Sequence, residues 1–137
     1  MHAPLSDHPA AWLGHELACR EDWRQSWSDD ELAAIREVAR HMPGTRVRDS
    51  SASDREAAVH LLRAGAAAER MGRIQHSLEH GSGAVWLQGL PADEFSLPQL
   101  EWIFWALASL VGTPVSQSAA GERVFHVRDE RFGEQDA

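Results

Sequence analysis

One apolar segment, between Ser96 and Gly112, constrains this chain more than any other feature. Ser96 can cap a helix, Pro98 suits its first turn, and Gly112 with Pro114 marks its end. The helix predicted over 97–111 is apolar on nearly every side, with the residues Leu97, Leu100, Trp102, Ile103, Phe104, Trp105, Leu107, Leu110 and Val111. Such a helix has to be buried on most sides. A chain of 137 residues offers little to cover it, which hints at further protein or a partner.

Three further helices are predicted before this segment. Ser28 and Glu31 have the spacing of a capping box, and Pro43-Gly44 stops the helix that follows. A longer helix is expected over 54–79, where Gly65 and Gly72 leave room for a break. Asp7, with Pro9 in the first turn, predicts a short helix near the start.

Strands are expected in two places, which makes the predicted fold class α+β. The run 84–88, with the letters AVWLQ, is bounded by glycines and is typical of a buried strand. Residues 124–127 can form a second strand. We find no repeat and no low-complexity tract, so residues 1–137 are interpreted as a single segment.

Composition excludes several classes of function. The formal net charge of −8 argues against a general nucleic-acid or anionic-membrane partner, because both need a positive field. Cys19 is the only cysteine, so neither an internal disulfide nor a thiolate zinc cluster is possible, and a reducing cytoplasm fits. No signal peptide is visible, and the apolar run is shorter than the roughly 20 residues that span a membrane. We therefore expect a cytoplasmic protein.

Four ordered blocks resemble the amino-terminal region of the TauD/TfdA family of Fe(II)/2-oxoglutarate-dependent dioxygenases, which are clavaminate synthase-like. They are 11–17 with Trp23 and Leu32, 80–91 (HGSGAVWLQGLP), 105–117 and 121–129. The resemblance covers nearly the whole chain and depends on order and spacing more than on any single motif. Gln88 stands where the family usually has Arg, and Ser118 where Asn usually follows Gln.

The resemblance implies the amino-terminal helices and first strands of a jelly-roll (double-stranded β-helix) enzyme, with an incomplete core. Members hold Fe(II) with a His-x-Asp/Glu pair and a distant His, which leaves positions open for 2-oxoglutarate and oxygen. None of the eight histidines here is followed two places later by Asp or Glu. We therefore expect no catalytic residue, metal ligand or cofactor in this chain, with Fe(II), 2-oxoglutarate and a small-molecule substrate implied for the intact enzyme. His126 and Asp129, three apart on a strand, would point to opposite faces.

Gln117 is the single candidate for substrate binding, because the resemblance implies that it lies near the mouth of the pocket. A loop amide bonded to the backbone is the alternative for that residue. His76 and His80, four apart on a helix, could share a metal, although no third ligand is evident. For the whole chain, the alternative function is a small non-catalytic binding or assembly module that uses helix 97–111 as its interface, and a homo-oligomer is possible.

Overall fold

The computed structural model describes residues 7–116, 118–124 and 127. Within them the chain forms helices α1 (Gly14–Ala18), α2 (Asp29–His41), α3 (Ala52–Arg63), α4 (Ala67–His80) and α5 (Leu97–Ser109). Two short 3-10 helices, η2 (Val47–Asp49) and η3 (Ala92–Glu94), join them. Strands β1 (Arg24–Ser26) and β2 (Trp86–Gln88) complete the described elements. The α+β class is confirmed, with helix predominating.

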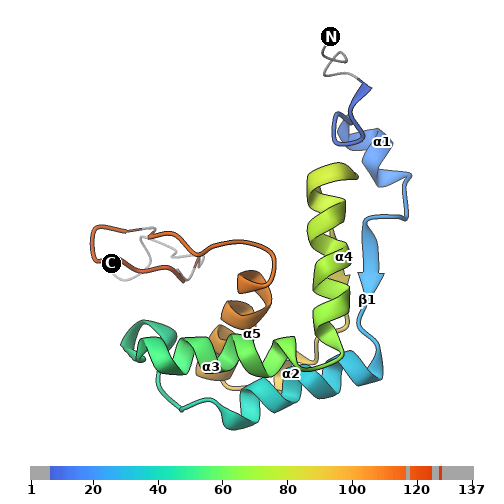
Figure 1. The fold of residues 1–137 in the computed structure, drawn as a ribbon. Helices are drawn as coiled ribbons and strands as arrows, with labels where there is room; N and C mark the ends of the chain where they lie inside the picture. The colour runs from blue at the N-terminus through green and yellow to red at the C-terminus, as the bar shows by residue number, and fades with distance from the viewer. Residues whose placement is uncertain (1–6, 117, 125–126, 128–137) are drawn as a thin grey trace, which may run out of the picture.

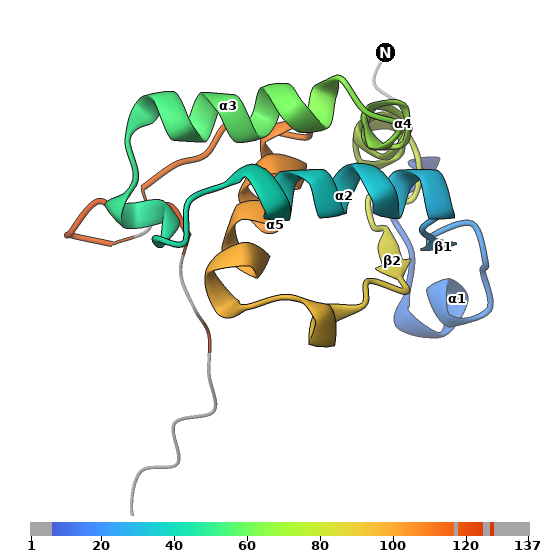
Figure 2. The ribbon, with the colours of Figure 1, turned by 90° about the horizontal axis from the view of Figure 1, so that it is seen from below.

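Helices α2, α3 and α5 pack together and form the core, whereas α4 stands across the line of α2 and α3 (Figures 1 and 2). Trp102 is fully buried at the centre, beside Ile35, Val38 and Leu62. Its indole Nε1 donates to the carbonyl of Thr45 at 3.0 Å, so the large ring is buried without an orphan donor. In the part of the chain that is described, no helix is long and apolar enough to cross a membrane.

Two of the three helix N-caps that the sequence predicts, Ser28 and Ser96, are present. Ser28 accepts from the backbone N–H of Glu31 at the start of α2, and Ser96 with Gln99 forms a reciprocal capping box at the start of α5. Helix α5 ends at Ser109, two residues before the predicted end. Both helices therefore begin where local side-chain chemistry satisfies their first amides.

The predicted helix 54–79 is divided into two helices. The chain breaks between Arg63 and Ala67, at Gly65 and not at Gly72. A Cβ at Gly65 would lie 2.7 Å from the Cβ of Ala34 on α2, closer than two carbon atoms can pack. The corner between α3 and α4 can therefore approach α2 only because residue 65 lacks a side chain.

The predicted amino-terminal helix is wrong in position. Residues 8–10 form a bend and a turn, and α1 begins only at Gly14, with the Glu16 carboxylate accepting from the backbone N–H of Leu13 at 2.8 Å. Pro9 disfavours helical geometry at His8, the residue before it, which opposes a helix that starts at Asp7.

The two strands form a small parallel sheet, with Arg24 opposite Trp86 and Ser26 opposite Gln88. The strand at 84–88 was expected to be buried, but Trp86 is 51% exposed. It packs against Trp23, with the two ring centroids 6.0 Å apart, and the two-stranded sheet covers only part of its surface. The first strands of a jelly roll are not seen among the described residues. Val124 and Val127 lie outside any strand, and Phe125 and His126 are not described.

Candidate functional site

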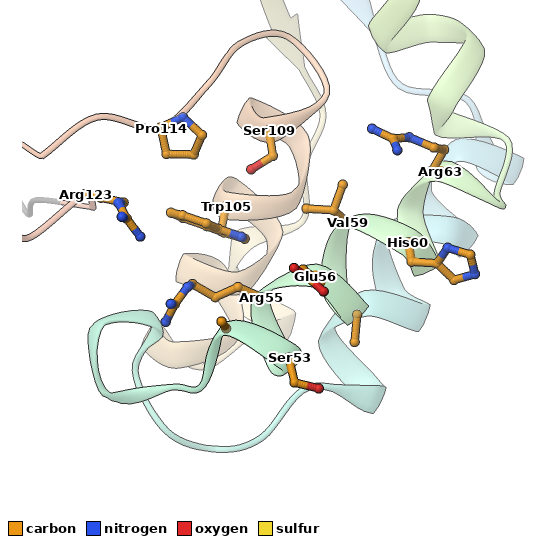
Figure 3. Close-up of a pocket in the computed structure, with 12 residues that line it drawn as sticks. Ser53, Arg55, Glu56, Val59, His60, Arg63, Trp105, Ser109, Pro114 and Arg123 are labelled. Atoms are coloured by element: carbon orange, nitrogen blue, oxygen red, sulfur yellow. The ribbon is translucent and has the colours of Figure 1, made fainter.

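A cavity of about 770 Å³ opens between α3, the carboxy-terminal half of α5 and the residues Pro114 and Arg123 (Figure 3). Its apolar wall comes from Val59, Trp105 and Pro114. Three arginines border it, Arg55 and Arg63 from α3 and Arg123 from the segment after α5. Concave sites of this size, with an apolar wall and a few polar groups, are typical of small-molecule binding.

Helical periodicity places most of these groups. Arg55, Val59 and Arg63 are spaced by four residues on α3, and Trp105 and Ser109 are spaced by four on α5. Residues four apart share a helix face, so each helix presents one lining stripe to the cavity. Figure 3 shows His60, also on α3, pointing away from Trp105.

The segment after α5 is tied to the rest of the molecule by ion pairing. Arg48 of η2 donates from Nη1 to Glu122 Oε1 at 2.9 Å, and Ser118 Oγ accepts from the backbone N–H of Glu122 at 3.3 Å. These contacts position the adjacent Arg123. A smaller cavity of about 400 Å³ lies between this segment and η2 and also borders Arg55 and Trp105.

The three arginines differ in how they are held. Arg55 is half-buried and donates from Nη1 to the carbonyl oxygen of Ser50 at 2.8 Å and to its hydroxyl at 3.3 Å. Arg63 and Arg123 are exposed, and within the described ranges neither has a hydrogen bond or ion pair. Glu56 is the only carboxylate among the lining residues, so positive charge predominates at this cavity.

Two buried donors on α5 lack acceptors. Trp105 Nε1 and Ser109 Oγ are both inaccessible to solvent and find no hydrogen-bond partner among the described residues. Leaving a buried polar group unpaired costs about 1–3 kcal/mol. Both residues line the larger cavity, and in Figure 3 the Ser109 hydroxyl points to the side on which Trp105 and Pro114 lie.

Helix α5 also keeps an uncovered apolar side. Phe104 is 59% exposed and Leu97 is 46% exposed, and Leu100, Leu107 and Val111 are only half-buried. The sequence indicated that little in the chain could cover this helix. That expectation is confirmed for this side, while Trp102, Ile103 and Ala106 are covered by α2 and α3.

Two nearly buried carboxylates away from the cavity are paired with arginines. Arg70 of α4 holds the nearly buried Glu31 of α2 with Nε–Oε2 and Nη2–Oε1 distances of 2.8 Å, which lowers the pKa of Glu31 despite its burial. Glu101 of α5 is 4% exposed and accepts from Arg46 Nε at 2.6 Å. These pairs join helices and are structural.

The sequence-predicted candidates are not brought together. Gln117 lies outside the described residues, so its role at a pocket mouth stays a prediction. The rings of His76 and His80 are 4.8 Å apart at the exposed end of α4. Throughout the described ranges, no three His, Cys, Asp or Glu side chains are grouped as a metal ion requires. These residues do not fit an iron site.

Sequence reasoning missed the arginine border. The expected burial of Trp105 is confirmed, but its place beside the cavity was not foreseen, and Ser109, Arg63 and Arg123 were not singled out. The four-residue spacing of Arg55 and Arg63 around Val59 was a usable signal for α3. Arg123 is distant in sequence, and only the tertiary fold brings it to the same cavity.

Comparison with known proteins finds a distant relative of this chain. The chain is 28% identical over 122 residues to FR-33289 synthase of Streptomyces rubellomurinus. The aligned region is 88% of this chain and 34% of the synthase, so the chain spans about a third of the length of that relative. No family model matches the chain.

Proposed function

We propose that this chain is the amino-terminal part of an Fe(II)/2-oxoglutarate-dependent dioxygenase and is not catalytically competent alone. The observation that carries the proposal is the match of nearly the whole chain to a third of a larger synthase. The four ordered blocks that resemble TauD/TfdA dioxygenases span residues 11–129 of this chain. The part not represented here would supply the jelly roll, the iron ligands and the 2-oxoglutarate anchor.

The reaction of the intact enzyme would hydroxylate an unactivated C–H bond of a small organic acid or amino-acid-like molecule. Oxygen and 2-oxoglutarate would be consumed, and the hydroxylated substrate, succinate and carbon dioxide would be released. Iron and 2-oxoglutarate supply the oxidising chemistry when bound. The described residues offer no ligand set for iron.

The structure supports a packing role for this part of the enzyme. Helices α2, α3 and α5 form a core around Trp102, and α5 leaves Phe104 and Leu97 exposed. A β-sheet with an apolar face would cover that side of α5 in the intact enzyme. Gln117 would lie at the rim of the substrate pocket, as the resemblance implies.

The first test is the nucleotide sequence after the codon for Ala137. The proposal expects the frame to continue into His-x-Asp or His-x-Glu, a later His and an Arg. The product of that longer frame should form succinate from 2-oxoglutarate with Fe(II), and replacing the first predicted iron ligand by Ala should abolish this. A stop codon in an intact gene, or tight one-to-one iron binding by the 137-residue chain, would contradict the proposal.

The exposed side of α5 favours one other candidate, a non-catalytic binding or assembly module. In that case the 137-residue chain forms a complex of defined stoichiometry through 97–111, with itself or with another chain. Sedimentation of the wild type against Phe104→Ser separates the two candidates. A discrete assembly that Phe104→Ser dissociates supports the module, whereas a monomer or ill-defined aggregates support the dioxygenase part.

A further inference from the structure

We propose that the cavity between α3 and α5 binds a small organic oxyanion, a molecule with one anionic head group and an apolar body. The exposed Arg63 and Arg123, which border the cavity from two sides, would hold the head group over Trp105 and Ser109. This site requires no iron and none of the residues of the proposed reaction, so it stands or fails independently of the proposed function.

The charge at the cavity is opposite to that of the molecule. The chain carries a formal net charge of −8, yet Arg55, Arg63 and Arg123 border one cavity with a single carboxylate, that of Glu56. Like charges gathered at one cavity repel one another unless an anion lies among them. Guanidinium groups bind carboxylate, phosphate and sulfonate oxygens through directed, often bidentate, hydrogen bonds.

The unpaired donors provide a second and independent indication of an anion. Trp105 Nε1 and Ser109 Oγ are buried on one face of α5, with no acceptor among the described residues. The neighbouring Trp102, one turn earlier, has its Nε1 satisfied by Thr45. An oxyanion has several lone pairs and can accept from an indole N–H, a hydroxyl and a guanidinium at once.

The wall of the cavity defines the rest of the ligand. Val59, Trp105 and Pro114 form an apolar surface beside the arginines, and the volume of about 770 Å³ exceeds the needs of an inorganic ion. Arg55 already donates a hydrogen bond to the Ser50 carbonyl, so it shapes the cavity and is not counted among the ligand-binding groups. Arg63 and Arg123 lack partners within the described ranges and are available to the ligand.

The experiment uses the 137-residue chain with ¹⁵N-labelled tryptophan. Each of the six indole N–H groups gives one resonance, and Trp105→Phe identifies that of Trp105. Benzoate, benzenesulfonate and phenyl phosphate are titrated at constant ionic strength. Benzyl alcohol is the uncharged control, and sulfate is the control that has an anionic group but no apolar part. We expect a saturable shift of the Trp105 resonance with at least one aromatic anion. The Trp12 resonance should not move, because its N–H donates to the Ser82 carbonyl at 2.7 Å.

Substitutions at exposed arginines complete the test. Arg123→Gln and Arg63→Gln should each weaken binding about tenfold, the usual effect of losing one charge-assisted hydrogen bond. Arg73→Gln is the matched control, because Arg73 is exposed on α4 and pairs only with Glu69 among the described residues. It should change affinity less than about twofold. Absence of a saturable shift, equal binding of benzyl alcohol, or an equal loss in Arg73→Gln would overturn the proposal.

Discussion

Trp102 and Trp105 lie one turn apart on α5 and have opposite surroundings. Trp102 faces α2 and α3, is fully buried, and donates its indole N–H to Thr45. Trp105 is also mostly buried, yet its N–H has no acceptor among the described residues, and a cavity lies beside it. The side toward α2 is thus complete in packing and hydrogen bonding, whereas the cavity side lacks polar partners. The difference indicates which surface of α5 the chain satisfies by itself.

The largest expected effect on stability is on the side of α5 that faces α2 and α3. Trp102→Phe removes the indole N–H from Thr45 and leaves space in the tightest part of the core, so it should cost about 3 kcal/mol in the free energy of unfolding. Trp105→Phe removes a donor that has no partner, and should cost about 1 kcal/mol or less. Urea denaturation of both variants measures the difference. Equal losses in the free energy of unfolding would mean that the two sides of α5 are equally well packed and hydrogen-bonded.

The Glu31–Arg70 ion pair belongs to the well-packed part of the molecule, and its contribution to stability can be measured as a function of pH. Arg70→Gln should cost about 2 kcal/mol at neutral pH, because it leaves a nearly buried carboxylate without its cation. The pKa of Glu31 is lowered in the folded protein, mainly by its hydrogen bonds with Arg70. The stabilisation is therefore fully present above the ordinary pKa of 4.5 and is lost as the pH falls through the folded value.

Stability curves over pH, measured on wild type and Arg70→Gln, should accordingly converge on the acid side. Arg73→Gln, which removes an exposed pair, should stay within about 0.5 kcal/mol of wild type throughout. A constant gap between wild type and Arg70→Gln at every pH would show that Arg70 acts by packing and not by charge.

A smaller effect of opposite sign is expected at the cavity side. Ser109→Ala removes a buried hydroxyl that has no acceptor among the described residues, so it should be neutral or stabilise the fold by about 1 kcal/mol. Ser82→Ala is the contrasting control, because the buried Ser82 hydroxyl donates to the Ala84 carbonyl at 2.9 Å. Thermal unfolding should separate the two variants. Destabilisation by Ser109→Ala would reveal an acceptor for that hydroxyl.

The smallest effect on stability is expected at the exposed apolar side of α5. Phe104→Ser should change the free energy of unfolding by less than about 0.5 kcal/mol, since more than half of that residue is already exposed. It should instead reduce binding of a hydrophobic dye such as anilinonaphthalene sulfonate. Unchanged dye fluorescence would place the accessible apolar surface elsewhere.

Local chemistry explains which parts of the fold could be predicted. Ser28, Ser96 and Pro98 define helix starts from side chains within one turn, and α2 and α5 begin where these residues indicate. The break at Gly65 depends on Ala34, which belongs to a different helix, so periodicity could offer Gly72 equally well. The pairing of Arg24 with Trp86 is likewise a tertiary event that no local pattern encodes.

The candidate site was less predictable than the fold. Its arginines come from α3 and from the segment after α5, and its unpaired donors are recognisable only once burial and acceptors are known. The single site residue that the sequence did propose, Gln117, is among those that the structure does not describe. The sequence pattern thus predicted helix α5, which lines the site, but not the arginines and unpaired donors at the cavity.

The parallel pairing of β1 with β2 has a consequence for the order of folding. Trp12 and Ser82, which are joined beside this sheet, are 70 residues apart, and three helices lie between the strands. Closing so long a loop costs conformational entropy before the contacts between the strands can offset it, so we expect the strands to meet after those helices have docked. The amino-terminal segment should therefore be the last to join during folding and the first to detach, leaving the helical core intact.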